Sequence, residues 1–122
     1  MSVVSDSPTV EFVRGHMEAW GNHDLEAARR NVAEGVEFFG NDVHTVGIDA
    51  YMEGLTYFTA AFDRGSLRII AARGDDRWAM VMAEVTVAGR PWLSARILEL
   101  DETGSKVTAE RVIFTAPPTP PA

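Results

Sequence analysis

A single carboxylate interrupts the mostly apolar segment "WAMVMAEVTVAG", which spans residues 78–89. Small apolar residues occupy every second position of this segment, which is the two-residue period of a β-strand. Glu84 therefore lies inside a predicted strand that is apolar on both faces. A buried carboxylate without a partner costs several kcal/mol, and buried, perturbed carboxylates often serve as general acids or bases. Glu84 is thus the first candidate for a catalytic group.

The next two predicted strands carry two charged residues that could pair with Glu84. A three-residue loop "GRP" would place Glu84 opposite Arg96, and a five-residue loop "DETGS" would place Arg96 opposite Glu110. Both lengths are common in hairpins. This register predicts a charged row, Glu84–Arg96–Glu110, on the sheet face that looks toward the helices. A slip of one residue in either hairpin would move the partners to opposite faces.

Large side chains surround the predicted row and could form the wall of a site for an apolar ligand. The pocket-lining candidates are Trp20, Tyr51, Phe58, Trp78, Met82, Glu110 and Val112. For the tryptophans, filling the core or a dimer interface is the commoner use. Tyr51 also fits the buried stripe of a helix, so packing is the favoured interpretation of that residue.

Two further residues could exchange protons with a ligand. His44 lies in "NDVHTVG", between the first predicted strand and the third predicted helix, where an imidazole could act as general base or acid. A surface-loop histidine is the favoured alternative. Tyr57, beside the apolar stripe of the same helix as Tyr51, could donate a hydrogen bond to a carbonyl or oxyanion. His16 is expected to be packed and hydrogen-bonded, and the histidine spacing fits no metal motif, so neither a metal nor a cofactor is expected.

The order of predicted elements indicates an α+β domain. Ser7–Pro8 is a typical helix start, and helical spacing predicts helices over 8–20, 24–34 and 48–62. Alternation and turn residues predict strands over 36–39, 67–73, 78–88, 92–100 and 106–115. Short loops between the last four strands imply an antiparallel meander, with three helices packed on one face of a curved sheet. Residues 1–115 form one domain in this interpretation.

The end of the chain differs in composition from the domain before it. The segment "APPTPPA", residues 116–122, contains four prolines and predicts an extended, disordered tail. It could be a ligand for a proline-reading domain, although a simple terminus is the commoner interpretation.

Composition narrows the classes of partner. The 122 residues carry a net charge of −7, with basic residues scattered rather than clustered, which argues against nucleic-acid binding. There is no cysteine, no signal-like N-terminus and no apolar run that could span a membrane, so we expect a cytoplasmic protein. A homodimer through the sheet is expected, because the convex face is predicted to be rich in apolar residues, namely Ala83, Val85, Ile97, Ala109 and Ile113.

Several segments together resemble the SnoaL-like proteins of the nuclear transport factor 2-like superfamily. These are "WGNHD" at the end of the first helix, "DLEAAR" in the second, "GVEFF", "VGIDAY" opening the third, and the final "LELDETGSKVTAERVIF". The resemblance covers about residues 10–114 and implies a cone-shaped fold whose bent sheet encloses an apolar pocket. It also implies a homodimer. Relatives include isomerases, cyclases, hydrolases and non-catalytic binding proteins, so the fold does not fix the activity.

Neither known set of catalytic acids in this superfamily is intact here. Ketosteroid isomerases carry an oxyanion-hole acid near the position of Arg96, and epoxide hydrolases carry a last-strand acid at the position of Val112. Two hypotheses therefore remain. One is an enzyme acting on an apolar oxygenated small molecule such as a polyketide or terpenoid, with Glu84 as base, Arg96 beside it and His44 or Tyr57 as partner. The other is a non-catalytic binding or interaction module in which the charged row is structural.

Overall fold

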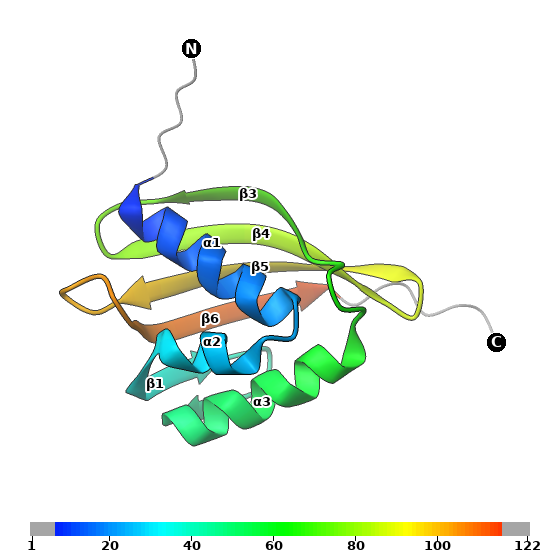
Figure 1. Cartoon of the computed structure of the whole chain (residues 1–122), viewed down its shortest axis with the longest axis horizontal. Helices are drawn as coiled ribbons and strands as arrows, with labels where there is room; N and C mark the ends of the chain where they lie inside the picture. The colour runs from blue at the N-terminus through cyan, green and yellow to red at the C-terminus, as the bar shows by residue number, and fades with distance from the viewer. Residues whose placement is uncertain (1–6, 116–122) are drawn as a thin grey trace, which may run out of the picture.

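The computed structural model describes residues 7–115 and contains three helices on one face of a six-stranded sheet (Figure 1). The helices are α1 (Pro8–Gly21), α2 (Leu25–Arg30) and α3 (Ile48–Ala61). The strands are β1 (Val32–Phe39), β2 (His44–Val46), β3 (Arg68–Gly74), β4 (Trp78–Val87), β5 (Arg90–Leu100) and β6 (Val107–Thr115). The predicted α+β class is confirmed.

The sheet has the strand order β2-β1-β6-β5-β4-β3. The strands β3 to β6 form the antiparallel meander that the short loops predicted. β1 runs parallel to β6, and β2 pairs antiparallel with β1 at the edge. The first half of the chain is thereby attached to the last strand, which brings α3 beside β1 and β2.

Local sequence signals set the helix starts. The side chain of Ser7 accepts a hydrogen bond from the Val10 backbone at the start of α1, and that of Asp24 caps α2 in the same way. The predicted second helix is too long, because the chain leaves the helix at Asn31 and Val32 pairs with Val107 of β6. Residues 44–46, expected to be a loop, form the edge strand β2.

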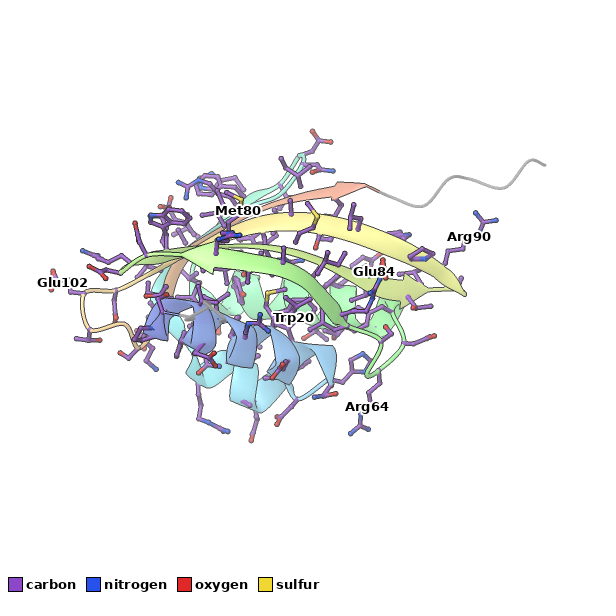
Figure 2. All side chains as sticks on the ribbon, turned by 90° about the horizontal axis from the view of Figure 1, so that it is seen from above. Trp20, Arg64, Met80, Glu84, Arg90 and Glu102 are labelled. Carbon is purple, nitrogen blue, oxygen red and sulfur yellow. The ribbon has the colours of Figure 1, made fainter. Side chains whose placement is uncertain are left out.

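The core lies between α1, α3 and the concave side of the sheet, which we call the inner face. Trp20 is almost fully buried there, and Figure 2 shows it between the helices and the sheet. The residues of α1 that recur at helical spacing, Val10, Val13 and Met17, are buried with it. Helical spacing therefore located the buried face of α1 correctly.

The register of the β4–β5 hairpin differs from the predicted one. Val87 pairs with Arg90, so the turn has two residues, Ala88 and Gly89, with φ angles of 52° and 78°. Such paired left-handed conformations belong to the type I′ turns whose twist suits hairpins. Glu84 pairs with Leu93 instead of Arg96. The predicted opposition of Glu84 and Arg96 is therefore wrong.

This change moves each β4 side chain to the other face of the sheet. Ala79, Val81, Ala83 and Val85 point toward the helices and are buried. Their small side chains leave room for α1, which packs against β3 and β4. The expectation that Ala83 and Val85 lie on the convex side, which we call the outer face, is wrong.

The larger residues of β4 lie on the outer face instead. Trp78, Met80 and Met82 are each between 38% and 48% exposed, and Figure 2 shows Met80 projecting from the sheet on the side away from the helices. Ile113 of β6 lies on the same face and is 68% exposed.

The β5–β6 hairpin keeps Arg96 and Glu110 on the inner face. Arg96 pairs with Val112, and Glu110 pairs with Leu98, two residues along β5. A bulge near Thr108 adds one residue to β6, and this preserves the shared face. The two charged residues are thus diagonal neighbours rather than directly opposite.

None of the described helices combines the length and the apolar character needed to cross a membrane. The proline-rich segment 116–122, for which a disordered tail was predicted, lies outside the described residues.

Candidate functional site

A hollow of about 300 Å³ lies between α3 and the inner face of the sheet, and we call it the α3 hollow. Residues of β1, α3, β5 and β6 line it, together with β2 and the loop before it. The lining residues are Phe38, Val43, Thr45, Ala50, Tyr51, Gly54, Leu55, Tyr57, Phe58, Arg96, Glu110 and Phe114. Most of these side chains are apolar, and Arg96 and Glu110 are the charged ones among them.

Glu110 accepts hydrogen bonds at both carboxylate oxygens. Arg96 Nη1 donates to Oε2 at 2.6 Å, and the Tyr51 hydroxyl donates to Oε1 at 2.5 Å. Glu110, Arg96 and Tyr51 are only 1%, 4% and 5% exposed. Hydrogen bonds of this kind, in which the acceptor is ionised, are about twice as strong as those between neutral groups. Tyr51 and Arg96 therefore hold this carboxylate in one orientation.

Aromatic rings and a serine surround the guanidinium of Arg96. Its Cζ lies 5.0 Å from the ring centre of Trp20 and 5.8 Å from that of Phe114. Nη2 donates to Ser94 Oγ at 3.2 Å. Within the described part of the chain, Arg96 Nε has no hydrogen-bond partner. Cation–π contacts thus supply part of the stabilisation that the buried arginine needs.

His16 contacts the same Tyr51 hydroxyl that Glu110 does. Its Nε2 is 3.0 Å from the Tyr51 hydroxyl oxygen, and its Nδ1 is 3.4 Å from Asn31 Nδ2. Burial lowers the pKa of His16 from 6.5 to about 4, so its ring is neutral at pH 7. Burial, with Glu110 nearby, raises the pKa of Tyr51 well above 10, so the phenol keeps its proton. The expectation that His16 is packed and hydrogen-bonded is confirmed.

Glu84, the first candidate from the sequence, lies outside this site. It is on the outer face, where its carboxylate accepts hydrogen bonds from Arg68 at 2.8 and 3.2 Å. The Arg68 side chain is 70% exposed and that of Glu84 is 25% exposed. The slip in the β4–β5 register is the reason, because it puts Glu84 and Arg96 on opposite faces.

The other two candidates for proton transfer lie at or beyond the edge of the α3 hollow. His44 stacks on Phe39 with ring centres 4.4 Å apart, and its Nε2 is 3.4 Å from Glu37. That half-exposed cluster belongs to the outer face, since Phe39 pairs with Arg111. Tyr57 does line the hollow, at its rim, and is 83% exposed.

The predicted lining residues divide into three groups. Tyr51, Phe58 and Glu110 line the hollow. Trp20 and Val112 are buried on the inner face, where Trp20 contacts Arg96 and Val112 pairs with it. Trp78 and Met82 lie on the outer face, because the register slip moved all of β4.

Sequence reasoning missed Phe38, Thr45, Leu55 and Phe114 as lining residues. Alternation along β6 did predict that Phe114 lies on the face of Glu110 and Val112, but Phe114 was not included among the lining residues. Phe38 and Thr45 depend on the pairing of β1 with β2 and β6, for which the sequence carries no local signal.

The arrangement can bind and move protons but offers little to a metal. Among residues 7–115, no group of three or more His, Cys, Asp or Glu side chains is placed to hold a metal ion. The polar groups meet at Glu110, which is a proton acceptor with a cation on one side and a phenol on the other.

Solved structures of other proteins share the fold of this chain. A protein of Kribbella flavida has a crystal structure that matches with a TM-score of 0.80 and 23% identity, covering 87% of this chain and 85% of that one. A putative ketosteroid isomerase from the same species matches with a TM-score of 0.76 and 16% identity, covering 94% of this chain and 83% of that one. A putative SnoaL-like polyketide cyclase from Shewanella putrefaciens matches with a TM-score of 0.76 and 12% identity, covering 93% of this chain and 90% of that one.

These structural matches are below 25% identity and show the shared fold. No curated protein matches the chain. The family of the SnoaL-like domain matches residues 13–119, which is most of the sequence. A protein of Cytophaga hutchinsonii described as NTF2-like shares this fold, and the family match shows that the chain belongs to the SnoaL-like domain family.

Proposed function

We propose that this protein binds an apolar, oxygenated small molecule in the α3 hollow and moves a proton to or from it with Glu110. The observation that carries the proposal is one buried carboxylate, fixed by Arg96 and Tyr51, in the wall of an otherwise apolar hollow. Apolar pockets with a few converging polar groups are the usual form of small-molecule sites. Glu84, suggested as the base by the sequence, is replaced in this role by Glu110.

The charges around the hollow favour an uncharged ligand. The cation of Arg96 and the anion of Glu110 compensate each other, and His16 is neutral at pH 7. A ligand carrying its own charge would leave that charge unpaired in an apolar environment, which is costly. An apolar body with one carbonyl or hydroxyl oxygen fits the hollow, because the polar groups of its wall converge on Glu110.

The chemistry that these groups support is proton transfer next to a carbonyl. Each carboxylate oxygen of Glu110 accepts one hydrogen bond and keeps a further lone pair, so it can still take a proton. Arg96 can stabilise negative charge that develops on a ligand oxygen. The neighbours described as a putative isomerase and a putative cyclase have the same fold, which supports acid–base chemistry by analogy.

A non-catalytic binding protein is the second candidate. One observation favours it: both oxygens of Glu110 are already engaged, by Arg96 and by Tyr51. These two contacts satisfy the buried carboxylate without any ligand, as a purely structural ion pair would. In this alternative the same hollow binds the ligand without reaction.

Hydrogen–deuterium exchange in 2-tetralone separates the two candidates. This bicyclic ketone has acidic hydrogens next to its carbonyl, and their loss in heavy water is followed by NMR. We expect the protein to accelerate the exchange over buffer, Glu110→Gln to lose the acceleration, and Glu84→Gln to keep it. Binding of 2-tetralone without accelerated exchange would favour the non-catalytic candidate, and acceleration unchanged in Glu110→Gln would refute the role of Glu110.

We also propose that two copies associate through the outer face. Its supporting feature is a set of exposed large apolar side chains on β3 to β6, namely Ile70, Trp78, Met80, Met82, Leu93 and Ile113. Apolar patches of this kind are typical of interfaces. We expect light scattering to give a dimer mass, and Met82→Lys to give a monomer. The control Tyr57→Lys replaces an aromatic residue that is even more exposed, at 83% against 41% for Met82, but lies away from this face, and it should remain dimeric.

A further inference from the structure

His16 is a buried polar residue beside the candidate site, and the proposed proton transfer by Glu110 does not use it. It is completely buried in α1 and reaches across to α3 and to the end of α2. Both ring nitrogens have polar neighbours, Tyr51 on one side and Asn31 on the other. A buried histidine with two partners has its tautomer set by those partners.

The hydrogen bonds around Tyr51 can point in only one direction. An ionised carboxylate accepts and does not donate, so the hydroxyl of Tyr51 donates its single proton to Glu110. Tyr51 must therefore accept from His16, which places a hydrogen on Nε2 of the imidazole. In a neutral ring Nδ1 then accepts, and Asn31 Nδ2 is the donor it meets. The chain runs from Asn31 through His16 and Tyr51 to Glu110.

We infer that His16 is a positioning residue: its Nε2 hydrogen holds the Tyr51 hydroxyl proton on Glu110 and blocks the inward path for protons. This inference rests on the proposed role of Glu110 and adds a specific property to it. A proton that Glu110 takes from a ligand cannot pass through Tyr51 to His16, because Nε2 already carries one. The proton therefore returns to the ligand or leaves through the hollow.

The same geometry fixes the carboxylate before a ligand arrives. Without a donor at His16, the Tyr51 hydroxyl could rotate toward another acceptor and release Oε1 of Glu110. With the donor present, the hydroxyl proton cannot turn toward His16, because it would then face the Nε2 hydrogen. Preorganisation of this kind is what a proton-transfer site requires.

The tautomer of His16 can be observed directly in the full chain without any ligand. Long-range proton–nitrogen NMR of protein labelled with ¹⁵N-histidine distinguishes the two neutral tautomers and the imidazolium, and loss of a signal in His16→Gln assigns it. We expect a single Nε2-protonated species at pH 7. In Tyr51→Phe the acceptor is gone, and we expect the Nδ1-protonated form to appear. An Nδ1-protonated ring or an imidazolium in the wild type would overturn the inference, as would an unchanged tautomer in Tyr51→Phe.

A matched pair of variants tests whether His16 acts on Tyr51. In a Tyr57→Phe background Tyr51 is the single tyrosine of the chain, so its hydroxyl proton gives one assignable NMR signal. The amide of His16→Gln can still donate to Tyr51, whereas His16→Leu cannot. We expect the downfield hydroxyl signal to persist with Gln and to be lost with Leu. Persistence with both would show that His16 only fills space. If the Leu variant does not fold, the tautomer measurement decides alone, and neither result depends on tetralone exchange.

Discussion

The molecule contains two glutamate–arginine pairs on opposite faces of one sheet. The pair of Arg96 and Glu110 is 2.6 Å apart on the inner face, with side chains 4% and 2% exposed. The pair of Arg68 and Glu84 is 2.8 Å apart on the outer face, with side chains 70% and 25% exposed. The distances are nearly equal, so the contact alone does not distinguish them. Burial does, because water screens the outer pair and is excluded from the inner one.

Removing the arginine of the inner pair should give the largest effect. Arg96→Met leaves the Glu110 carboxylate buried without its cation, and losses of this kind are about 3–5 kcal/mol. Urea denaturation of wild type and variant measures the free energy of unfolding. The double variant Arg96→Met/Glu110→Leu should recover most of the loss, since no charge then remains unpaired. A loss below about 1 kcal/mol in the single variant would contradict the buried pair.

The acid side of the stability profile should show the burial of His16. Its folded pKa of about 4 lies below the unfolded value of 6.5, so between these values the unfolded state binds more protons. Stability is therefore complete above pH 6.5 and falls as the pH drops toward 4, by on the order of 3 kcal/mol. His16→Gln does not titrate, so the difference between its profile and that of wild type isolates this contribution. If the free energies of unfolding of wild type and His16→Gln changed with pH in the same way, His16 would have the same pKa in the folded and unfolded states, which would contradict the prediction.

Removing the arginine of the outer pair should have the smallest effect on the free energy of unfolding. Arg68→Met removes an exposed cation, and exposed pairs contribute about 0–1 kcal/mol. Any loss should shrink further in 1 M salt, because exposed charges are screened there. Urea denaturation at low and high salt provides the measurement. A loss as large as that of Arg96→Met would remove the contrast between the two faces.

The contrast between the faces also explains which predictions from sequence held. The three helices, apart from the length of the second, the meander and the shared face of Arg96 and Glu110 followed from spacing and turn residues. The position of Glu84 did not, since Ala88 adopts a left-handed φ of 52° that non-glycine residues seldom adopt. With "AG" as the turn instead of "GRP", the pairing shifts by three residues, and an odd shift exchanges the faces.

Local sequence patterns could not predict which distant segments of the chain contact each other. Tyr51 and Glu110 are 59 residues apart, and His16 and Tyr51 are 35 apart. The sequence placed Tyr51 on a buried stripe and His16 on a packed face, but which side chains meet depends on how α1, α3 and β6 pack. The pairing of β1 with β6 also joins segments far apart in the sequence. It places Phe38 and Thr45 in the wall of the hollow.

A crystal structure of the protein with 2-naphthol tests the central claim most directly, because this bicyclic phenol has one hydroxyl on an apolar body. The account predicts naphthol in the α3 hollow, with its oxygen within hydrogen-bonding distance of the Glu110 carboxylate and its rings against Phe58 and Phe114. Naphthol bound only on the outer face, against Met80 or Met82, with the hollow free of ligand, would contradict the account.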